Sequence, residues 1–332
     1  MIDIAIDIGS SYTSIFVSGN GVVLHEPTLV AYISGKVLAV GEAAQNMKGK
    51  TPDKTTIVAP VTDGVISDFA ACNIMLVDFF NRILPDSYFP PKARIICAIP
   101  TGLTSDQRHI YEDCIMQAHK RIKEVVLVES VILAGIGVGL PVASVAGGLI
   151  ADIGGGATEV AALSMAGIIA GCGLNLGGDH MDKTIADSVL VKTKTKLGLG
   201  VVKRVKEQIA SLFDNDMAEK QVGGLDSITK ALTTVTISAS DLYDILYPYY
   251  DRVGNAIDSI LTMCPPDAAA ELNRNGVYLV GGGAKIPGLA QMLSNKLGMR
   301  ITIVADPEFA TISGAGRLLG DRELLKKILM QK

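Results

Sequence analysis

The sequence predicts an α/β fold whose two similar lobes face each other across a cleft. Two stretches, DIGSS at residues 7–11 and DIGGG at residues 152–156, each lie between two apolar, strand-like runs. Glycine permits a tight reversal at such a point, so each stretch predicts a β-hairpin that begins beside a carboxylate. A third apolar run, at residues 277–280, also ends in glycines. Because one unit recurs in each half of the chain, we expect two lobes that hold a polyphosphate and Mg²⁺ between their hairpins.

Composition agrees with two lobes and excludes some functions. The chain has 332 residues, more than one hydrophobic core usually serves, and 48% of them are hydrophobic. Its net charge of -4 argues against a nucleic-acid-binding surface, which is normally basic. The five cysteines form no CxxC pair and no signal peptide is evident, so we expect a reduced, cytoplasmic protein. The four histidines show no metal-ligand spacing.

The first half of the chain alternates predicted strands and helices. Alternating isoleucines from Ile2 to Ile8 begin a series of strands that continues to residue 40. Further strands are expected at residues 94–99 and 125–128. Helices are expected at residues 42–47, 69–84 and 104–118, the last of them capped by Thr104 or Ser105.

Two uncharged runs open the second half, at residues 130–151 and 160–178, and each is long enough to span a membrane. Glycines interrupt both runs and Pro141 interrupts the first. We therefore expect a buried helix, a loop and a strand in the first run, and two strands joined at residues 166–167 in the second.

Beyond these runs, a polar, lysine-rich segment at about residues 180–240 predicts a small inserted subdomain. We expect strands at residues 233–237, 277–280 and 301–304. Helices are expected at residues 241–246, onward to about 263, from Pro287, and from 315 to 332. The last helix has an apolar face that we expect to dock on the first lobe rather than on lipid.

The three glycine junctions, in this order, resemble those of the actin-like ATPase superfamily and specifically of the MreB cell-shape cytoskeleton family. Further matching motifs are HEPTLVA at 25–31, VGEAA at 40–44, DGVISDF at 63–69, IGVGLP at 136–141, GGDHMD at 177–182 and GGGA at 281–284. The resemblance implies an actin-like two-lobe fold of duplicated ribonuclease-H-like domains, with a nucleotide cleft and two smaller inserted subdomains. The implied subdomains are IA at 1–31, 67–141 and 308–332, IB at 32–66, IIA at 142–178 and 243–307, and IIB at 179–242.

The same resemblance implies ATP or ADP between the lobes, with Mg²⁺ held near Asp7 and Asp152 through water. The implied nucleotide contacts are Gly9, Ser10, Ser11, Tyr12, Gly154, Gly155, Gly156, Gly178, Asp179, Lys203, Lys206, Gly281, Gly282, Gly283 and Ala284. Gly282 and Gly283 are expected to lie under the adenine.

The positions that match the family's hydrolysis residues are Glu129, Ser130 and Ala157. Family members carry Glu where this chain has Ser130 and Thr where it has Ala157. Serine is a poorer base than glutamate and alanine cannot form the hydrogen bond, so we expect slow hydrolysis unless Glu129 substitutes by a shift of one residue. Lys203 replaces a Glu expected at the ribose and Tyr12 replaces a small amide. These departures indicate a divergent paralogue that still binds ATP.

The resemblance further implies filaments of this chain, alone or with a paralogue, along the inner face of the plasma membrane, for cell shape or intracellular organisation. Tyr88 and Phe89 lie where relatives carry residues that insert into membrane, although Pro90 and Pro91 could instead pack these rings against the lobe. An alternative is a non-polymerising adaptor that regulates an active paralogue or binds membrane proteins. A small-molecule kinase of the same superfamily would need a substrate base that does not stand out, and a chaperone would need a substrate-binding domain.

Overall fold

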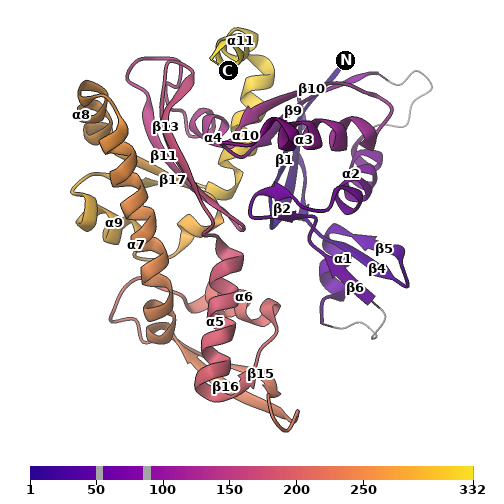
Figure 1. The fold of residues 1–332 in the computed structure, drawn as a ribbon, viewed down its shortest axis with the longest axis vertical. Coiled ribbons are helices and arrows are strands. Elements are labelled where there is room, and N and C mark those ends of the chain that lie inside the picture. Colours follow the sequence, from indigo (N-terminus) through magenta and orange to yellow (C-terminus); the bar gives the residue numbers. More distant parts are fainter. Residues whose placement is uncertain (50–54, 85–90, 332) are drawn as a thin grey trace.

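Two five-stranded sheets form the centres of two lobes in the computed structural model, which describes residues 1–49, 55–84 and 91–331 (Figure 1). The first sheet has the order β10 (Ile122–Glu129), β9 (Ala93–Ile99), β1 (Ile2–Ile8), β2 (Tyr12–Val17) and β3 (Gly21–Pro27). The second has the order β13 (Gly167–Leu174), β12 (Thr158–Ser164), β11 (Gly148–Ile153), β17 (Val277–Val280) and β18 (Ile301–Ile303). In both sheets, the first three strands in chain order pair antiparallel with one another, and the last two add to them as parallel strands. The predicted duplication is confirmed.

Helices cover these sheets and complete the lobes. They are α1 (Gly41–Met47), α2 (Phe69–Ile83), α3 (Ser105–Ala118), α4 (Ser130–Gly137), α5 (Gly178–Thr193), α6 (Leu199–Ile209), α7 (Ala239–Met263), α8 (Pro266–Asn275), α9 (Leu289–Leu297), α10 (Ala310–Gly320) and α11 (Arg322–Met330), with short 3₁₀ turns η1 (Gly282–Lys285) and η2 (Pro307–Phe309). Strand β9 is buried along its whole length because helices cover both of its faces. Ile95 and Cys97 pack in the cluster with α2 and α3, whereas Ile96 and Ala98 pack in the cluster with α4 and α10.

Helices α4 and α10 join the lobes at a crossing where their backbones touch. A Cβ atom at Gly314 would lie 1.7 Å from the Leu133 carbonyl oxygen, and one at Gly137 would lie 1.9 Å from that of Ala310. Arg317 crosses the same joint and donates a hydrogen bond to the Ile136 carbonyl oxygen at 2.8 Å. The buried cluster around this crossing includes residues of both sheets, so the lobes share one core at this end of the molecule.

Two small sheets extend from the lobes, as Figure 1 shows for β4, β5 and β6 on one side and for β15 and β16 on the other. The first consists of β4 (Val30–Ile33), β5 (Lys36–Val40) and β6 (Thr55–Val58), and the second of β14 (Thr195–Lys196), β15 (Glu219–Asp226) and β16 (Leu232–Ser238). A two-stranded pair consists of β7 (Val61–Thr62) and β8 (Val65–Ile66), and Gly64 in its turn lines the cavity described below. The residue boundaries suggested for the four subdomains stay a prediction.

Several helix ends differ from those expected. Helix α7 runs without a break through Pro248, and Ser238 caps it in a capping box with Asp241. Pro287 does not lie in the first turn of α9, because Gly288 is the N-cap. The glycines after β17 lead into the 3₁₀ turn η1 rather than directly into an α-helix.

The C-terminal segment forms two helices rather than one, because the Asp321 side chain caps the start of α11 through the Leu324 N–H. Leu325 and Ile328 are buried in the cluster between the lobes, so α11 packs on the joint rather than on the first lobe alone. Among the described residues, no helix is both long enough and apolar enough to cross a bilayer.

Candidate functional site

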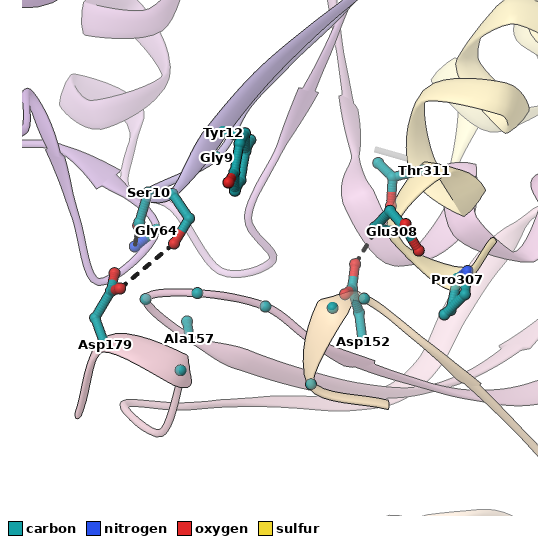
Figure 2. A pocket seen from close by; sticks show the side chains of 18 of the residues that line it. Gly9, Ser10, Tyr12, Gly64, Asp152, Ala157, Asp179, Pro307, Glu308 and Thr311 are labelled. Carbon is teal, nitrogen blue, oxygen red and sulfur yellow. Dashed lines mark hydrogen bonds between the residues drawn. The ribbon is translucent and has the colours of Figure 1, made fainter. Parts of the chain in front are cut away.

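A cavity of about 540 Å³ lies between the lobes, a size typical of small-molecule sites. Eighteen of the residues singled out from the sequence line it: Asp7, Gly9, Ser10, Ser11, Tyr12, Ser130, Asp152, Gly154, Gly155, Gly156, Ala157, Gly178, Asp179, Lys203, Lys206, Gly281, Gly282 and Gly283. Figure 2 shows Ser10 and Tyr12 of the first lobe across from Ala157 and Asp179 of the second. The structure therefore brings together residues as far apart in sequence as Asp7 and Gly283, in a chain whose halves repeat one unit.

The two hairpin turns that border the cavity have the same backbone hydrogen bond. The Gly9 N–H donates to the Tyr12 carbonyl oxygen at 3.0 Å, and the Gly154 N–H donates to that of Ala157 at 2.9 Å. Thr28 supports the first turn by donating to the Gly9 carbonyl oxygen at 2.7 Å. Backbone N–H groups in successive tight turns form concavities that bind anions, so the two turns are suited to hold one polyphosphate.

The two turns approach each other so closely that glycine is required at the contact. A Cβ atom at Gly155 would lie 2.1 Å from Ser11 Oγ, and one at Gly156 would lie 2.3 Å from Ser10 Oγ. The Ser11 hydroxyl also donates to Asp179 Oδ1 at 3.4 Å, across the cleft. A larger residue in this second turn would have to displace the Ser10 or Ser11 side chain.

Asp7 and Asp152 end equivalent strands, β1 and β11, on the two sides of the cavity. Burial raises the pKa of Asp7 to about 7, and the negative charge of Glu159 adds to this. Burial likewise raises the pKa of Asp152 to about 7, with Glu159 and Asp7 adding to it and a hydrogen bond from Thr311 opposing it. A cation would relieve this shared repulsion.

The donor set in this cleft fits a hydrated Mg²⁺. Within the described ranges, no three acidic, histidine or cysteine side chains gather closely enough to enclose a metal ion. Mg²⁺ usually keeps several waters and uses only one or two carboxylates together with phosphate oxygens. Asp7 and Asp152 offer that number, and the two turns offer the phosphate site.

Glu159 is a further carboxylate that lines the cavity, and no motif in the sequence singled it out. Its Oε1 accepts a hydrogen bond from the Thr101 N–H at 2.6 Å, and its Oε2 accepts one from the Ser130 hydroxyl. Glu129, in contrast, does not line the cavity, and its Oε1 accepts a hydrogen bond from Arg108 at 2.7 Å. Glu129 therefore does not share the place that Ser130 has in the cavity wall.

The two predicted lysines make different contacts. Lys206 donates to the Gly178 carbonyl oxygen at 2.8 Å and pairs with Asp182 at 2.7 Å, which ties α6 to the start of α5. Lys203 instead places its Nζ atom 5.0 Å from the centre of the Tyr12 ring. Lys206 is thus a structural support of the site, and Lys203 spans the cleft.

An aromatic stack forms another wall. The Tyr12 and His25 rings stack with their centres 4.6 Å apart and their planes at 7°, and Phe309 contacts His25 at 4.8 Å. His25 Nδ1 also lies 2.9 Å from Ser14 Oγ. Burial lowers the pKa of His25, which favours the neutral form of its ring.

The third glycine junction closes the cavity beside Asp152. Gly281 has a φ of +80°, and a Cβ atom there would lie 2.4 Å from Asp152 Oδ1. Tyr250 donates to the Gly283 carbonyl oxygen at 3.0 Å, which supports this surface from behind. Ala284 is buried and does not line the cavity.

His25 lines the cavity and begins the motif at residues 25–31, but that motif predicts no role for it in a site. Other lining residues belong to no motif, because each comes from a different element: Glu159, Glu207, Tyr250, Lys285, Glu308 and Thr311. Figure 2 shows Thr311 directed at Asp152. Tyr88 and Phe89, expected to contact membrane, lie outside the described residues.

Comparison with known proteins gives a consistent result over the whole chain. A sequence model of the MreB/Mbl protein family matches residues 1–327. Cell shape-determining protein MreB of Escherichia coli K12 is 32% identical over 324 residues, which covers 96% of this chain and 93% of the relative. Cell shape-determining protein Mbl of Bacillus subtilis is 31% identical over 328 residues and covers 98% of both chains.

Solved structures agree with this. The crystal structure of MreB5 of Spiroplasma citri bound to AMPPNP has a TM-score of 0.90 at 27% identity, covering 100% of this chain and 99% of that one. The same protein bound to ADP also has a TM-score of 0.90. The MamK double helical filament, at 19% identity and a TM-score of 0.83 over 96% of this chain and 99% of that one, shares the fold.

Proposed function

The chain belongs to the MreB/Mbl family, and from this premise we propose that it is an actin-like cytoskeletal protein that binds ATP and ADP between its lobes and assembles into filaments. The observation that carries the proposal is the pair of equivalent turns, each beside an aspartate, around one cavity. MreB5 of Spiroplasma citri, similar over the full length, has been solved with AMPPNP and with ADP.

In this proposal each part of the cavity has a task. The turns at residues 9–12 and 154–157 hold the phosphates by their N–H groups. Gly282 and Gly283 give the adenine a flat surface that Tyr250 supports from behind. Asp7 and Asp152 hold Mg²⁺ through water, and the bound ion would neutralise charge on the phosphates. Ala157 has no group that could orient the attacking water, so we expect slow turnover.

Large exposed apolar side chains at opposite ends of the molecule support self-assembly. Ile228 and Leu232, by the β15–β16 turn, are 79% and 89% exposed, and Met263, at the far end of α7, is 67% exposed. Figure 1 shows the β15–β16 hairpin and the α8 end of α7 at opposite ends of the second lobe. Copies joined head to tail would bury both patches, and a contact of this kind generates filaments.

A role in cell shape or intracellular organisation follows from the named relatives, and we propose it for this chain on that basis. Peripheral attachment to the inner face of the plasma membrane is part of the proposal. Leu329 and Met330 on α11 are exposed beside Lys326 and Lys327, a combination that suits an anionic lipid surface. Copolymerisation with a paralogue stays a prediction.

The test is high-speed sedimentation of the purified protein with ATP, with ADP and without nucleotide, followed by electron microscopy of the pellets. We expect filaments that depend on ATP. Replacing Ile228 and Leu232 together by Asp should keep the protein in the supernatant, since two charges would then have to be buried at the contact. Unchanged binding of mant-ATP, a fluorescent ATP analogue, by this variant is the control. No pellet in any state would contradict assembly and favour the adaptor.

A further inference from the structure

Ser130 and Glu159 come from different lobes and form a hydrogen-bonded pair in the wall of the cavity. Ser130 is the first residue of α4, and Glu159 lies on β12, two residues after the second turn. The Ser130 hydroxyl donates to Glu159 Oε2, and the Thr101 N–H donates to Glu159 Oε1 at 2.6 Å. Both side chains line the cavity that Asp7 and Asp152 also line.

These contacts hold the carboxylate in one orientation and leave it able to act. Each carboxylate oxygen has a second lone pair, and a serine oxygen that donates its hydrogen can still accept one. A proton that reaches Ser130 Oγ can therefore pass to Glu159 along an existing hydrogen bond. The Ser130 hydroxyl therefore does not act alone, because the Glu159 carboxylate accepts its hydrogen bond.

No other group that the family pattern suggests is available for this task. Glu129 is held by Arg108 and does not line the cavity. Ala157 has only a methyl group. Glu159 lies opposite Asp152 in the register of β11 and β12, and both line the cavity.

We propose that Ser130 and Glu159 act as a dyad that orients the attacking water and accepts its proton in ATP hydrolysis, an inference that rests on the proposed nucleotide function. The water oxygen forms a bond to the γ-phosphorus. The bond from that phosphorus to the β–γ bridging oxygen breaks, and its electron pair stays on ADP. The water proton moves to Ser130 Oγ while the serine proton moves to Glu159, and the proton then returns to the released phosphate.

The experiment compares Glu159→Gln and Ser130→Ala with the wild type in single-turnover phosphate release. We expect release to slow about 100-fold in Glu159→Gln, which loses the proton acceptor, and about tenfold in Ser130→Ala, which loses the link to it. Ser130→Thr keeps a hydroxyl and should retain most of the rate. Glu124→Gln on β10 and Ser105→Ala on α3 make the same chemical changes at exposed positions and should match the wild type.

A binding measurement separates this role from a structural one. Affinity for mant-ATP should stay within about twofold in Glu159→Gln, whereas affinity for mant-ADP with aluminium fluoride, which imitates the transferring phosphoryl group, should fall about tenfold or more. Wild-type phosphate release in Glu159→Gln would overturn the dyad, and so would a wild type that binds mant-ATP without releasing phosphate. A wild type that does not bind mant-ATP would contradict the proposed function itself.

Discussion

At the scale of single residues, three carboxylates around the cavity would repel one another when no cation is bound. Asp7 and Asp152 end their strands on facing sides of one cavity, and Glu159 lies near both. Burial and mutual repulsion raise the pKa of each aspartate to about 7, so neither carboxylate ionises easily without a cation. The residues that would bind Mg²⁺ thereby lower the stability of the protein without it.

This arrangement predicts a pH dependence of stability. An aspartate whose pKa rises from 3.8 to about 7 on folding binds its proton more tightly in the folded chain. The stabilisation of the folded state by this tighter proton binding is therefore fully present below pH 3.8, and it is lost as the pH rises to about 7. Asp7→Asn removes that loss, so in EDTA at pH 8 we expect its melting temperature to exceed that of the wild type by about 2 °C or more.

Addition of Mg²⁺ and ATP should reverse this order, because asparagine has no charge to hold the ion. The wild type should then gain more in melting temperature than Asp7→Asn, and its gain should grow between pH 6 and pH 8. Asp187→Asn, an exposed change on α5, is the matched control. Equal gains in the two proteins would show that Asp7 does not take part in binding.

At the scale of elements, the cleft is bridged by a column of stacked side chains. Lys203 on α6 lies over one side of the Tyr12 ring, and His25 on β3 stacks against that ring, with Phe309 of η2 beyond. The resemblance described above implies that Tyr12 and Lys203 both depart from the family pattern, and the structure places these two side chains in contact. The two side chains therefore form one interaction that joins the lobes beside the cavity.

If this contact helps to keep the cleft closed, removal of either side chain should speed nucleotide release. A cation–π contact contributes about 0.5 to 2 kcal/mol, so Tyr12→Leu and Lys203→Met should each speed mant-ATP dissociation by a factor between about 2 and 30. The double variant should be no faster than the faster single one, because one interaction is lost in each case. Stopped-flow chase experiments measure these rates, with Arg204→Met, exposed on α6, as control. Additive effects would show that the two residues act separately.

At the scale of the whole molecule, the duplicated sheets meet through one joint. Helices α4 and α10 lie backbone to backbone, and the shared cluster around them contains residues from both sheets. The cavity lies between the same two lobes, and the close spacing of α4 and α10 holds these lobes together at one end. Glycine at the crossing makes that spacing possible.

The joint predicts opposite effects for one substitution at two positions of α10. In Gly314→Ala the new methyl group would lie 1.7 Å from the Leu133 carbonyl oxygen, and we expect unfolding free energy to fall by about 3 kcal/mol. Gly320→Ala meets open space at the end of the same helix and should raise it by about 0.5 kcal/mol. Urea denaturation measures both, and a loss in Gly320→Ala equal to that in Gly314→Ala would rule out the steric reason.

Much of the fold could be predicted from local pattern. The two Asp-Ile-Gly units lie in equivalent hairpins, the capping box of α3 forms at Thr104, and the strands of the second uncharged run meet at the expected turn. Helix ends were less well predicted where side-chain contacts decide them, as at Asp321. Pro248 lies inside α7, although proline disfavours a helix interior, because the buried face of that long helix outweighs the local cost.

The sequence by itself determined the duplicated fold and the lobe-facing glycines and aspartates, because these depend on backbone conformation and on a repeat visible in the chain. Only the tertiary structure decided which groups surround them. It placed Glu159 behind Ser130, turned Glu129 to Arg108, and set Lys203 over Tyr12. These pairs come from elements far apart in sequence, and no local periodicity encodes which side chains meet when two lobes close on each other.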